Sequence, residues 1–561
     1  MTLMPSEATE QSKWDLETDI VVGGTGAGGL TSAIVAHDSG LRVIVLEKSS
    51  VVGGGAAVSD GEVWIPRSHV AEREGIKDND ENIEEYLDYL SSSYPVDKSV
   101  RKRWIEAGRI AANYLDEKAG LKWIIVRGLS DVFAGVIPSA SYEGRYLEVK
   151  PIAGEELGAW KDKILRSPQV PYFVTNEEMF RFGGASTLKD WPQDLIQTRI
   201  KNDVLCQGSG LIAYLLKAVA IDRKIPVYLE APIKKILMKD GRVAGIKTEV
   251  SGEAKSIRCR FGVVLNIGGY DWHPVYPYFF EQVPEWHSVM PPSIEGDFIT
   301  LAQDTGASVI PYRIYSAMPG FHIPGEEWFG KDLYRQLTFE GGLPHSLVVN
   351  KSGRRFADES YFQDLGIKGA LHDKTLGYVN YPFYIILDQQ YLDNYPFGSI
   401  EPGTPLPEGL AVKAQSLKEL AEGLRIDSHT LIATVERFNE FARKGVDEDF
   451  GRGSKAWANQ YTGDLRHKPN PNLGPIEKQP FYGIRLHFVG IGHNGGYWID
   501  SDGRVLNMAG NPILGLYACG NCVAFTELGP TYQDGACLSR SIAFGYVAAE
   551  HIAKNLAKSQ D

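Results

Sequence analysis

The stretch Asp19-Ile-Val-Val-Gly-Gly-Thr-Gly-Ala-Gly-Gly29 decides the fold of this chain. A short run of apolar, β-branched residues leads directly into a glycine turn, and helix-forming residues follow from 30 to 39. A second apolar run, residues 41–46, predicts another strand, which ends in Glu47. Strand, tight turn, helix and strand in this order predict a βαβ unit at the start of a parallel sheet.

The glycine turn has the spacing of a dinucleotide-binding site. In Gly24-x-Gly26-x-x-Gly29 the first glycine permits the tight turn, the second lets the backbone approach a pyrophosphate, and the third allows close helix packing. The helix N-terminus offers free N–H groups to the phosphates. Glu47 is placed to bind a ribose 2′-hydroxyl and disfavours a 2′-phosphate. The residues assigned to this site are Gly24, Gly26, Ala27, Gly28, Gly29 and Glu47.

Three further features favour FAD over NAD. A second glycine-rich cluster, residues 53–61, would extend contact along a longer ligand. Two distant glycine segments, 268–269 and 520–521, would approach the same ligand. The N-terminus of the last helix would face N1 and the C2 carbonyl of the flavin and stabilise its reduced form. The additional residues predicted to bind FAD are Lys48, Gly54, Gly55, Ala56, Ser59, Gly61, Ala231, Gly268, Gly269, Gly520, Asn521, Ala536 and Leu538.

The length of 561 residues is too great for one ordinary compact core. Between about 285 and 470 the chain changes to long polar helices separated by proline-rich turns, and glycine-punctuated strands return after 481. We therefore expect an α/β fold, in which a Rossmann-like FAD-binding domain is interrupted by an inserted α+β substrate or cap domain. The expected boundaries are 1–285 and 476–561 for the FAD-binding domain and 286–475 for the cap.

Charge and composition limit the classes of partner that we expect for the protein. With 71 acidic and 58 basic residues the net charge is −13, which repels nucleic acids and anionic membrane surfaces. The polar opening segment lacks the order of a secretion signal, and no apolar run is long enough to span a membrane, so we expect a cytoplasmic protein. Cys519 and Cys522 have the spacing of a redox pair or metal half-site, but without a second ligand pair we favour two small buried residues and no metal.

Together these segments resemble the flavoprotein family that includes fumarate reductase, succinate dehydrogenase and the 3-ketosteroid dehydrogenases. The resemblance extends over nearly the whole chain, through Glu295-Gly-Asp297 and residues 348–356 to the segment 515–549. It implies that the inserted domain closes over the flavin and that the active site lies at the junction. The position of covalent flavin attachment in succinate dehydrogenase, before the Gly53 cluster, holds no histidine here, so we expect non-covalent FAD.

Two segments favour a dehydrogenase over a fumarate reductase. Residues 358–364 and the loop 529–535 lack the proton-delivering and carboxylate-binding arginines that a fumarate reductase needs. That loop is instead similar to the Thr-Tyr-Pro-Gly-Pro-Gly loop of 3-ketosteroid 1-dehydrogenases, and Gly61-x-x-Trp-Ile-Pro66 is similar to their Gly-Val-Trp-Ile-Pro segment. The resemblance implies that the Tyr532 hydroxyl and the Gly535 N–H hold a ketone oxygen and stabilise the forming enolate.

The resemblance also implies a tyrosinate base, which takes an α-proton while a β-hydride goes to flavin N5. Tyr334 is the candidate base, with Tyr142 and Tyr361 as alternatives. His493 is interpreted as a loop or flavin-edge residue. Several departures, including Ala56 for a threonine, a shorter final loop and Phe133 for a tyrosine, suggest a relative that acts on a different ketone.

The sequence therefore predicts FAD-dependent α,β-desaturation of a cyclic ketone, such as a 3-ketosteroid or a cyclohexanone-type ring. Two alternatives stay open, an enone or enoate reductase with the same cofactor and a non-catalytic flavin-binding module. The electron acceptor is open as well, and oxygen, a quinone and a carrier protein are the candidates.

Overall fold

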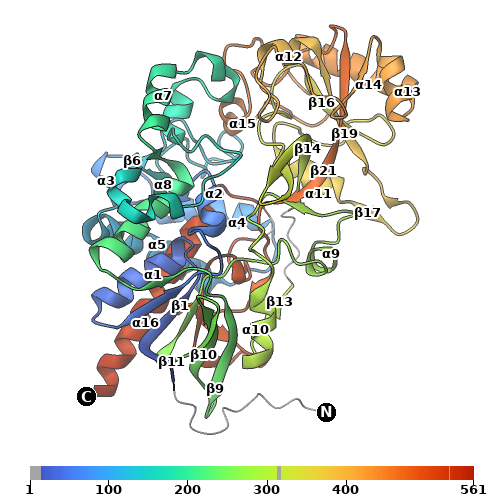
Figure 1. The fold of residues 1–561 in the computed structure, drawn as a ribbon. Coiled ribbons are helices and arrows are strands. Elements are labelled where there is room, and N and C mark those ends of the chain that lie inside the picture. The colour runs from blue at the N-terminus through green and yellow to red at the C-terminus, as the bar shows by residue number, and fades with distance from the viewer. Residues whose placement is uncertain (1–13, 312–316, 530, 561) are drawn as a thin grey trace.

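The computed structural model describes residues 14–311, 317–529 and 531–560 (Figure 1). The segment 1–13, on which the expected absence of a secretion signal rests, and Pro530 of the final loop lie outside the described residues. No helix in the described part of the chain is long and apolar enough to cross a membrane.

An eight-stranded sheet forms the base of the molecule. β1 (Leu16–Gly23) pairs in parallel with β2 (Val43–Leu46) on one side and with β11 (Glu253–Leu265) on the other. The glycine turn connects β1 to α1 (Ala27–Asp38), so the predicted βαβ unit is confirmed. The remaining strands of this sheet are β8 (Val227–Tyr228), β9 (Ile233–Lys239), β10 (Arg242–Val250), β23 (Arg504–Leu506) and β24 (Pro512–Ala518).

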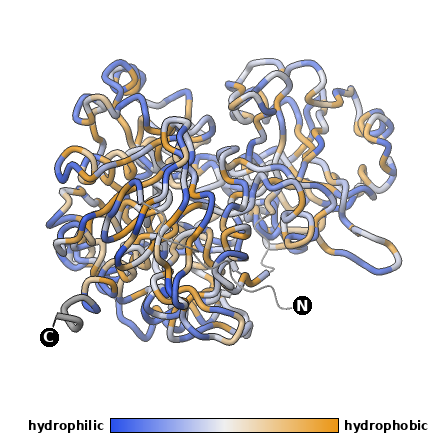
Figure 2. The backbone as a smooth tube through the Cα atoms, turned by 60° about the horizontal axis from the view of Figure 1, so that its bottom comes forward, coloured by the Kyte–Doolittle hydropathy of each residue, from blue (hydrophilic) through white to orange (hydrophobic). Residues whose placement is uncertain are grey.

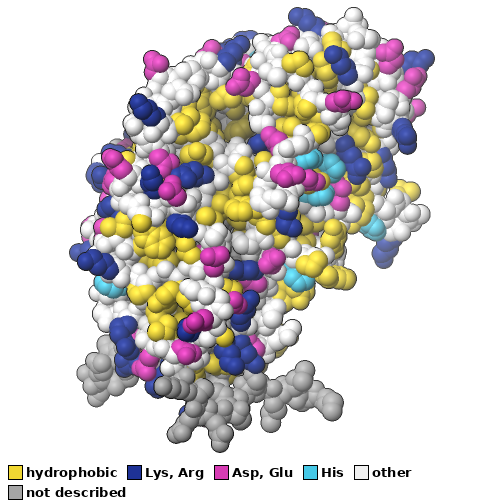
Figure 3. Space-filling model, in the orientation of Figure 1, with side chains coloured by type: hydrophobic (Ala, Val, Ile, Leu, Met, Phe, Trp, Pro, Cys, Tyr) yellow, Lys and Arg dark blue, Asp and Glu magenta, His cyan; other side chains and the backbone are white. Residues whose placement is uncertain are grey.

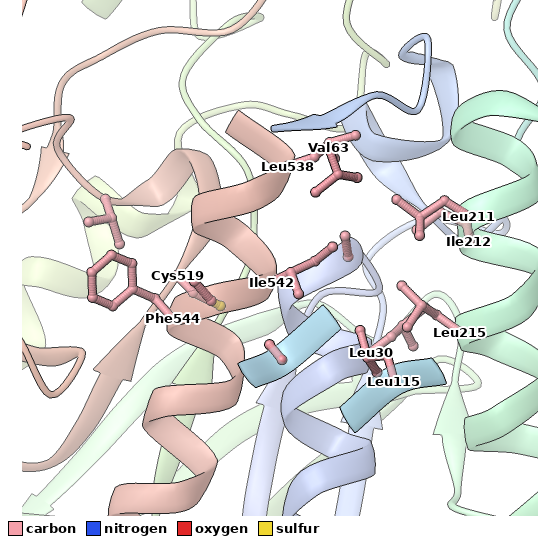
Figure 4. Packing of buried hydrophobic residues seen from close by; sticks show 14 of the residues in the cluster. Leu30, Val63, Leu115, Leu211, Ile212, Leu215, Cys519, Leu538, Ile542 and Phe544 are labelled. Carbon is pink, nitrogen blue, oxygen red and sulfur yellow. The ribbon is translucent and has the colours of Figure 1, made fainter. Parts of the chain in front are cut away.

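The first and last helices pack together at a glycine contact. A Cβ added to Gly28 of α1 would lie 2.3 Å from the backbone oxygen of Ser541 in α16 (Ala536–Gln560). A Cβ added to Gly545 would lie 2.2 Å from the backbone oxygen of Gly28. The two helices therefore approach at backbone distance, and Leu30 and Ile542 belong to the hydrophobic core beside this contact (Figure 4).

Helices and short strands between residues 54 and 228 cover one side of this base (Figure 1). A three-stranded sheet, β3-β5-β4, lies among them. The elements are α2 (Gly54–Val58), β3 (Val63–Trp64), α3 (His69–Arg73), α4 (Asp80–Ser91), α5 (Lys98–Ala119), β4 (Trp123–Ile125), β5 (Tyr146–Val149), β6 (Ile152–Ala153), α6 (Asn176–Arg181), α7 (Gln193–Lys201), β7 (Val204–Leu205) and α8 (Gln207–Leu216).

A second sheet of seven strands forms the other lobe, with its own hydrophobic clusters (Figure 1). The hydropathy-coloured backbone in Figure 2 shows hydrophobic segments in both lobes. The strands of the second sheet are β12 (His287–Ser288), β14 (Ala317–Trp328), β15 (Lys331–Gln336), β16 (Ser346–Asn350), β19 (Phe383–Asp388), β20 (Val412–Ala414) and β21 (Phe481–Gly490). Its helices are α11 (Phe362–Gly369), α12 (Gln389–Asn394), α13 (Leu417–Leu424), α14 (Ser428–Lys444) and α15 (Ala456–Tyr461), and β17 (His372–Asp373) pairs with β18 (Gly377–Tyr378) beside them.

The strand pairing places the boundaries between the two units at residues other than those expected from the sequence. β21 lies beyond the boundary expected at 475, yet it pairs with β12, β14, β19 and β20 of the second sheet. Conversely, α10 (Asp297–Thr305) and β13 (Val309–Ile310) follow the boundary expected at 285, but α10 packs on β9 and β13 pairs with β22 (Gly496–Tyr497). α9 (Tyr276–Glu281) lies between the two units. β12 and β21 thus carry the chain between the lobes, and the residues after each lead to the site.

Candidate active site

Two adjoining cavities lie where the lobes meet. The smaller, of about 170 Å³, is lined by the glycine turn and the end of β2. The larger, of about 510 Å³, extends toward the second sheet. In Figure 3 hydrophobic side chains gather around a hollow between the upper left and upper right parts of the molecule. The residues that line both cavities are Ser59, Met290, Ile491, Asn521, Cys537 and Leu538. A ligand in the smaller cavity can therefore reach the larger one.

The glycine turn is built for close backbone approach. Gly24 has φ of +90°, and a Cβ there would lie 2.2 Å from the backbone oxygen of Asn266. Its N–H donates to the Leu46 carbonyl at 2.7 Å, which ties the turn to the end of β2. Gly26 caps the N-terminus of α1 without a side chain of its own. Backbone N–H groups at this helix end suit a pyrophosphate.

Glu47 ends β2 at the wall of the smaller cavity. Its carboxylate accepts hydrogen bonds from the Thr25 N–H at 3.0 Å and the Ser49 N–H at 2.9 Å, which fix its orientation. Burial raises its pKa, and these hydrogen bonds act in the opposite direction. Lys48 pairs with Glu295 at 2.6 Å and Asp297 at 3.0 Å, so its charge joins this loop to the start of α10.

The residues predicted to hold FAD divide into three groups according to the cavity that they line. Those that line the smaller cavity are Gly24, Gly26, Ala27, Glu47, Lys48, Gly54, Gly55, Ala56, Ser59, Ala231, Gly268, Gly520, Asn521 and Leu538. Gly61 lines the larger cavity instead. Those that line neither cavity are Gly28, Gly29, Gly269 and Ala536.

The glycines outside the cavity lining have packing roles. Gly28 forms the contact with α16, and a Cβ on Gly29 would lie 2.2 Å from the Gly24 oxygen, so Gly29 permits the turn. Gly269 makes room for the ring of His493, whose Nε2 would lie 1.5 Å from an added Cβ. These three residues shape the cavity wall without lining it, and their assignment as direct cofactor contacts stays a prediction.

Four acidic residues, Asp60, Glu62, Glu340 and Asp534, line the larger, mostly apolar cavity. Among its described lining residues the only arginine or lysine is Arg335, and Arg335 is paired with Glu326 at 2.7 Å. Burial and the neighbouring acids raise the pKa of Glu62 well above its ordinary value. Burial likewise raises the pKa of Asp534 to about 7, against hydrogen bonds from Tyr532 and Trp457.

One short helix, whose Trp457 and Tyr461 pack against the core of the first sheet, holds two of these carboxylates. In α15 the Trp457 indole N–H donates to Asp534 Oδ2 at 2.9 Å, and the Tyr461 hydroxyl donates to Asp60 Oδ2 at 3.2 Å. The two aromatic rings stack with their centroids 4.9 Å apart. Glu62 differs from these two acids, because its buried Oε1 has no hydrogen-bond partner within the described chain.

Tyr532 and Gly535, predicted to hold a ketone oxygen, both line the larger cavity. The Tyr532 N–H donates to Gln363 Oε1 at 2.8 Å, which fixes the loop. Burial and nearby Asp534 raise the pKa of Tyr532 well above its ordinary value, so the hydroxyl keeps its proton and can donate it in a hydrogen bond. The Gly535 oxygen accepts from the Trp64 N–H at 3.2 Å, which joins this loop to β3.

The predicted base, Tyr334, does not reach the cavity. Its ring stacks on His287 with centroids 3.7 Å apart, beside His487, and it is absent from the cavity lining, whereas its neighbour Arg335 lines the cavity. Successive side chains of a strand point to opposite faces, which accounts for the difference. The alternatives are also placed elsewhere: Tyr142 is 63% exposed, and buried Tyr361 donates its hydroxyl to Gln363.

His493 and the pair Cys519 and Cys522 lie in surroundings that indicate structural roles. His493 lines the larger cavity and accepts from the Tyr270 N–H at 2.7 Å, and burial lowers its pKa to about 3, so the ring is neutral. Cys519 and Cys522 are buried free thiols, and burial raises the pKa of Cys522 to about 11. Within the described residues neither belongs to a group of metal-ligating side chains.

Sequence reasoning missed the carboxylates. The only signal was that Glu62 occupies the segment similar to Gly-Val-Trp-Ile-Pro and that Asp534 lies in the loop similar to Thr-Tyr-Pro-Gly-Pro-Gly. Neither family segment contains an acid. Trp457 and Tyr461, which hold Asp534 and Asp60, carry no motif of their own.

Comparison with known proteins agrees with this geometry. The sequence model of the FAD binding domain family matches residues 19–537. The chain belongs to this flavoprotein family. It is 33% identical to the 3-oxosteroid 1-dehydrogenase of Mycobacterium tuberculosis over 97% of this chain and 99% of that protein. It is 32% identical to the 4-oxocyclohexanecarboxylate 2-dehydrogenase of Sinomonas cyclohexanicum over 97% of this chain and 94% of that one.

A solved structure extends the likeness to the fold. The 3-ketosteroid Δ1-dehydrogenase of Sterolibacterium denitrificans, in complex with 1,4-androstadiene-3,17-dione, superposes with a TM-score of 0.86 at 30% identity. The alignment covers 96% of this chain and all of that one. The predicted fold class and FAD as cofactor are confirmed. The protein is an FAD-dependent oxidoreductase, and its relatives support dehydrogenation of cyclic ketones.

Proposed function

We propose that this enzyme desaturates a neutral, multi-ring cyclic ketone at the α and β carbons, and that it binds FAD non-covalently. The observation that carries the proposal is the larger cavity, which is continuous with the FAD cavity and has Tyr532 and Gly535 in its wall. Its volume of about 510 Å³ falls within the range of roughly 300–1,000 Å³ that is common for drug-sized ligands. A ring system of steroid size would fill such a cavity and contact its walls better than a single cyclohexanone ring.

The charge of the cavity favours a neutral substrate. Asp60 and Asp534 would repel a substrate carboxylate in their ionised forms, and Arg335 is occupied by Glu326. A carboxylate moved into an apolar site needs a partner to offset the loss of its water. We therefore favour a ketone without a carboxyl group over one of the 4-oxocyclohexanecarboxylate type. The same lack of an available arginine speaks against the enoate reductase alternative.

The residues supply orientation and proton chemistry. Bound FAD accepts the hydride from the β-carbon. Tyr532 and the Gly535 N–H donate to the ketone oxygen, and these hydrogen bonds strengthen as negative charge develops there. The apolar walls formed by residues such as Met290, Phe339 and Ile491 exclude water and hold the rings. A base in the wall takes the α-proton.

The test is an anaerobic titration of the holoenzyme with 3-ketosteroids, cyclohexanone and 4-oxocyclohexanecarboxylate, followed by the loss of the oxidised flavin absorption. We expect reduction by the steroid ketone and little by the carboxylate. The variant Tyr532→Phe should lower kcat about 10²–10³-fold, the usual effect of losing one oxyanion donor, because Gln363 binds the Tyr532 backbone and keeps the loop in place. Reduction by the carboxylate alone would contradict the proposed substrate class.

A further inference from the structure

We propose that Asp534 is the base that removes the α-proton, and that Glu62 is its protonated partner, so that a carboxyl pair takes the place of a tyrosinate. The inference rests on the proposed desaturation and names a catalytic group within it. Both acids line the larger cavity and both are at least 95% buried. The tyrosine candidates lie outside the cavity lining, which leaves the base unassigned. Of the four acids in that lining, Asp534 and Glu62 lie on the two segments that the hydrogen bond from Trp64 to Gly535 joins, whereas Glu340 accepts from the Gly398 N–H at 3.1 Å.

Asp534 stands next to the groups that hold the ketone. It lies between Tyr532 and Gly535 on one short loop, and the α-carbon of a ketone is bonded to the carbonyl carbon whose oxygen those two groups would bind. The Trp457 indole fixes one carboxylate oxygen at 2.9 Å. A side chain held in this way has the fixed orientation that proton abstraction requires.

Glu62 is built into the same wall but has nothing to bind. The strand after it is tied to the Asp534 loop by the hydrogen bond from the Trp64 N–H to the Gly535 oxygen. Its Oε1 is buried without a partner, and an isolated buried carboxylate is costly, so Glu62 carries a proton. Two close carboxyls that share one proton are a known arrangement for general acid–base work, in which one is neutral while the other ionises.

Substrate binding would itself activate the base. The Tyr532 side chain interacts with Asp534 and lowers the pKa of its carboxyl. When the Tyr532 hydroxyl turns to the ketone oxygen, Asp534 loses one donor, and its carboxylate becomes more basic. The α C–H bond then breaks, its proton passes to the Asp534 carboxylate, and its electron pair moves into the enolate. FAD, when bound, would supply the acceptor for the β-hydride, so that loss of the two hydrogens gives the enone.

The groups that surround this pair all act on it in a defined direction. Asp60 and Glu148 disfavour ionisation of Glu62, and Asp60 and Asp131 disfavour ionisation of Asp534. Trp457 and Tyr532 favour the ionised form of Asp534 through hydrogen bonds. Of the cations in these surroundings, Arg335 is paired with Glu326, and Arg145 with Asp131 at 2.7 Å and Asp78 at 2.8 Å. Within the pair, Asp534 therefore ionises more readily than Glu62.

The experiment measures proton transfer without oxidation. The holoenzyme is reduced under argon, mixed with a saturated 3-ketosteroid in D₂O, and exchange of the α-hydrogens is followed by mass spectrometry. We expect exchange with wild type, a loss of at least about 100-fold in Asp534→Asn, and a change of less than about tenfold in Glu62→Gln. Asp427→Asn, which changes an exposed helix cap, is the control and should exchange as wild type does.

The pH profile of wild-type exchange gives a test that needs no variant. With Asp534 as base the rate should rise with an apparent pKa near 7, the value to which burial raises this carboxyl. A rise that begins only near pH 10 would indicate a tyrosinate and overturn the assignment. Exchange by Asp534→Asn at the wild-type rate would overturn it as well.

Flavin reduction separates this inference from the proposed function. A wild-type enzyme whose flavin is reduced by the ketone, together with an Asp534→Asn variant reduced at the same rate, would overturn only the role of Asp534. A wild-type enzyme reduced by no cyclic ketone would overturn the proposed function and this inference together. FAD content and the melting temperature of each variant report whether a loss of exchange comes from a loss of fold.

Discussion

The replacement Trp457→Phe tests the base through the residue that positions it. The indole N–H donates to Asp534 Oδ2 at 2.9 Å, and both residues are buried. A hydrogen bond to a charged group contributes roughly 1.5–3 kcal/mol, and one pKa unit corresponds to about 1.4 kcal/mol. Loss of the donor favours the neutral carboxyl, so the pKa of Asp534 should rise by roughly one to two units from about 7. At neutral pH the ionised fraction, and with it kcat/KM, should fall about 5- to 50-fold.

The measurement is the pH dependence of kcat/KM for flavin reduction, with α-proton exchange over the same range. The acid limb should move to higher pH while the plateau at alkaline pH is largely recovered. The matched control is Trp123→Phe, which removes another buried indole hydrogen bond, to the Ala112 carbonyl at 3.0 Å, away from the carboxylates. An acid limb that stays in place, or that moves equally in the control, would refute the role assigned to Trp457 and Asp534.

Three further predictions follow from the packing and the cofactor cavity. Gly28→Ala should lower the free energy of unfolding by about 1–3 kcal/mol through its clash with the Ser541 backbone, whereas Gly108→Ala, where the nearest atom is 3.7 Å away, should raise it by roughly 0.5–1 kcal/mol; urea unfolding of both variants tests this. Glu47→Gln should weaken FAD binding about tenfold or more, measured by refilling of protein from which FAD has been removed, and an unchanged affinity would contradict the role of Glu47. Burial raises the pKa of Glu148 to about 8, so the stability linked to its proton is complete below about pH 4 and is lost as pH rises through 8; Glu148→Gln should flatten this part of the curve of urea midpoint against pH.

The fold could be predicted because its signals are local. The turn at Gly24 requires a positive φ and open backbone space, and strand, helix and acid follow it at fixed spacing. The change to polar helices after residue 285 indicated an inserted domain. The pairing of β21 with the second sheet was not accessible in the same way, since an apolar strand carries no mark of the sheet it joins.

The site was predicted unevenly for a related reason. A glycine in the motif can contact a ligand or make room for another element, and only the fold shows that Gly28 meets α16 while Gly26 faces the cavity. Tyr334 lies on a strand next to Arg335, and a shift of one position moves a side chain to the other face of the sheet. Position along the chain was nearly right, but the direction of the side chain was not.

The carboxylates explain why a tyrosinate base and this cavity do not suit each other. Burial removes water from Tyr532, and neighbouring Asp534 and Asp60 add negative charge, and each of these raises the cost of a phenolate. The same negative charge makes Tyr532 a dependable donor to a ketone oxygen and repels a carboxylate substrate. Proton acceptance must then come from the group that holds the charge most easily, and Asp534 has two hydrogen-bond donors where Glu62 has none. One local feature, an acidic wall whose described arginine is already paired, thus governs both which substrate enters and which residue acts as base.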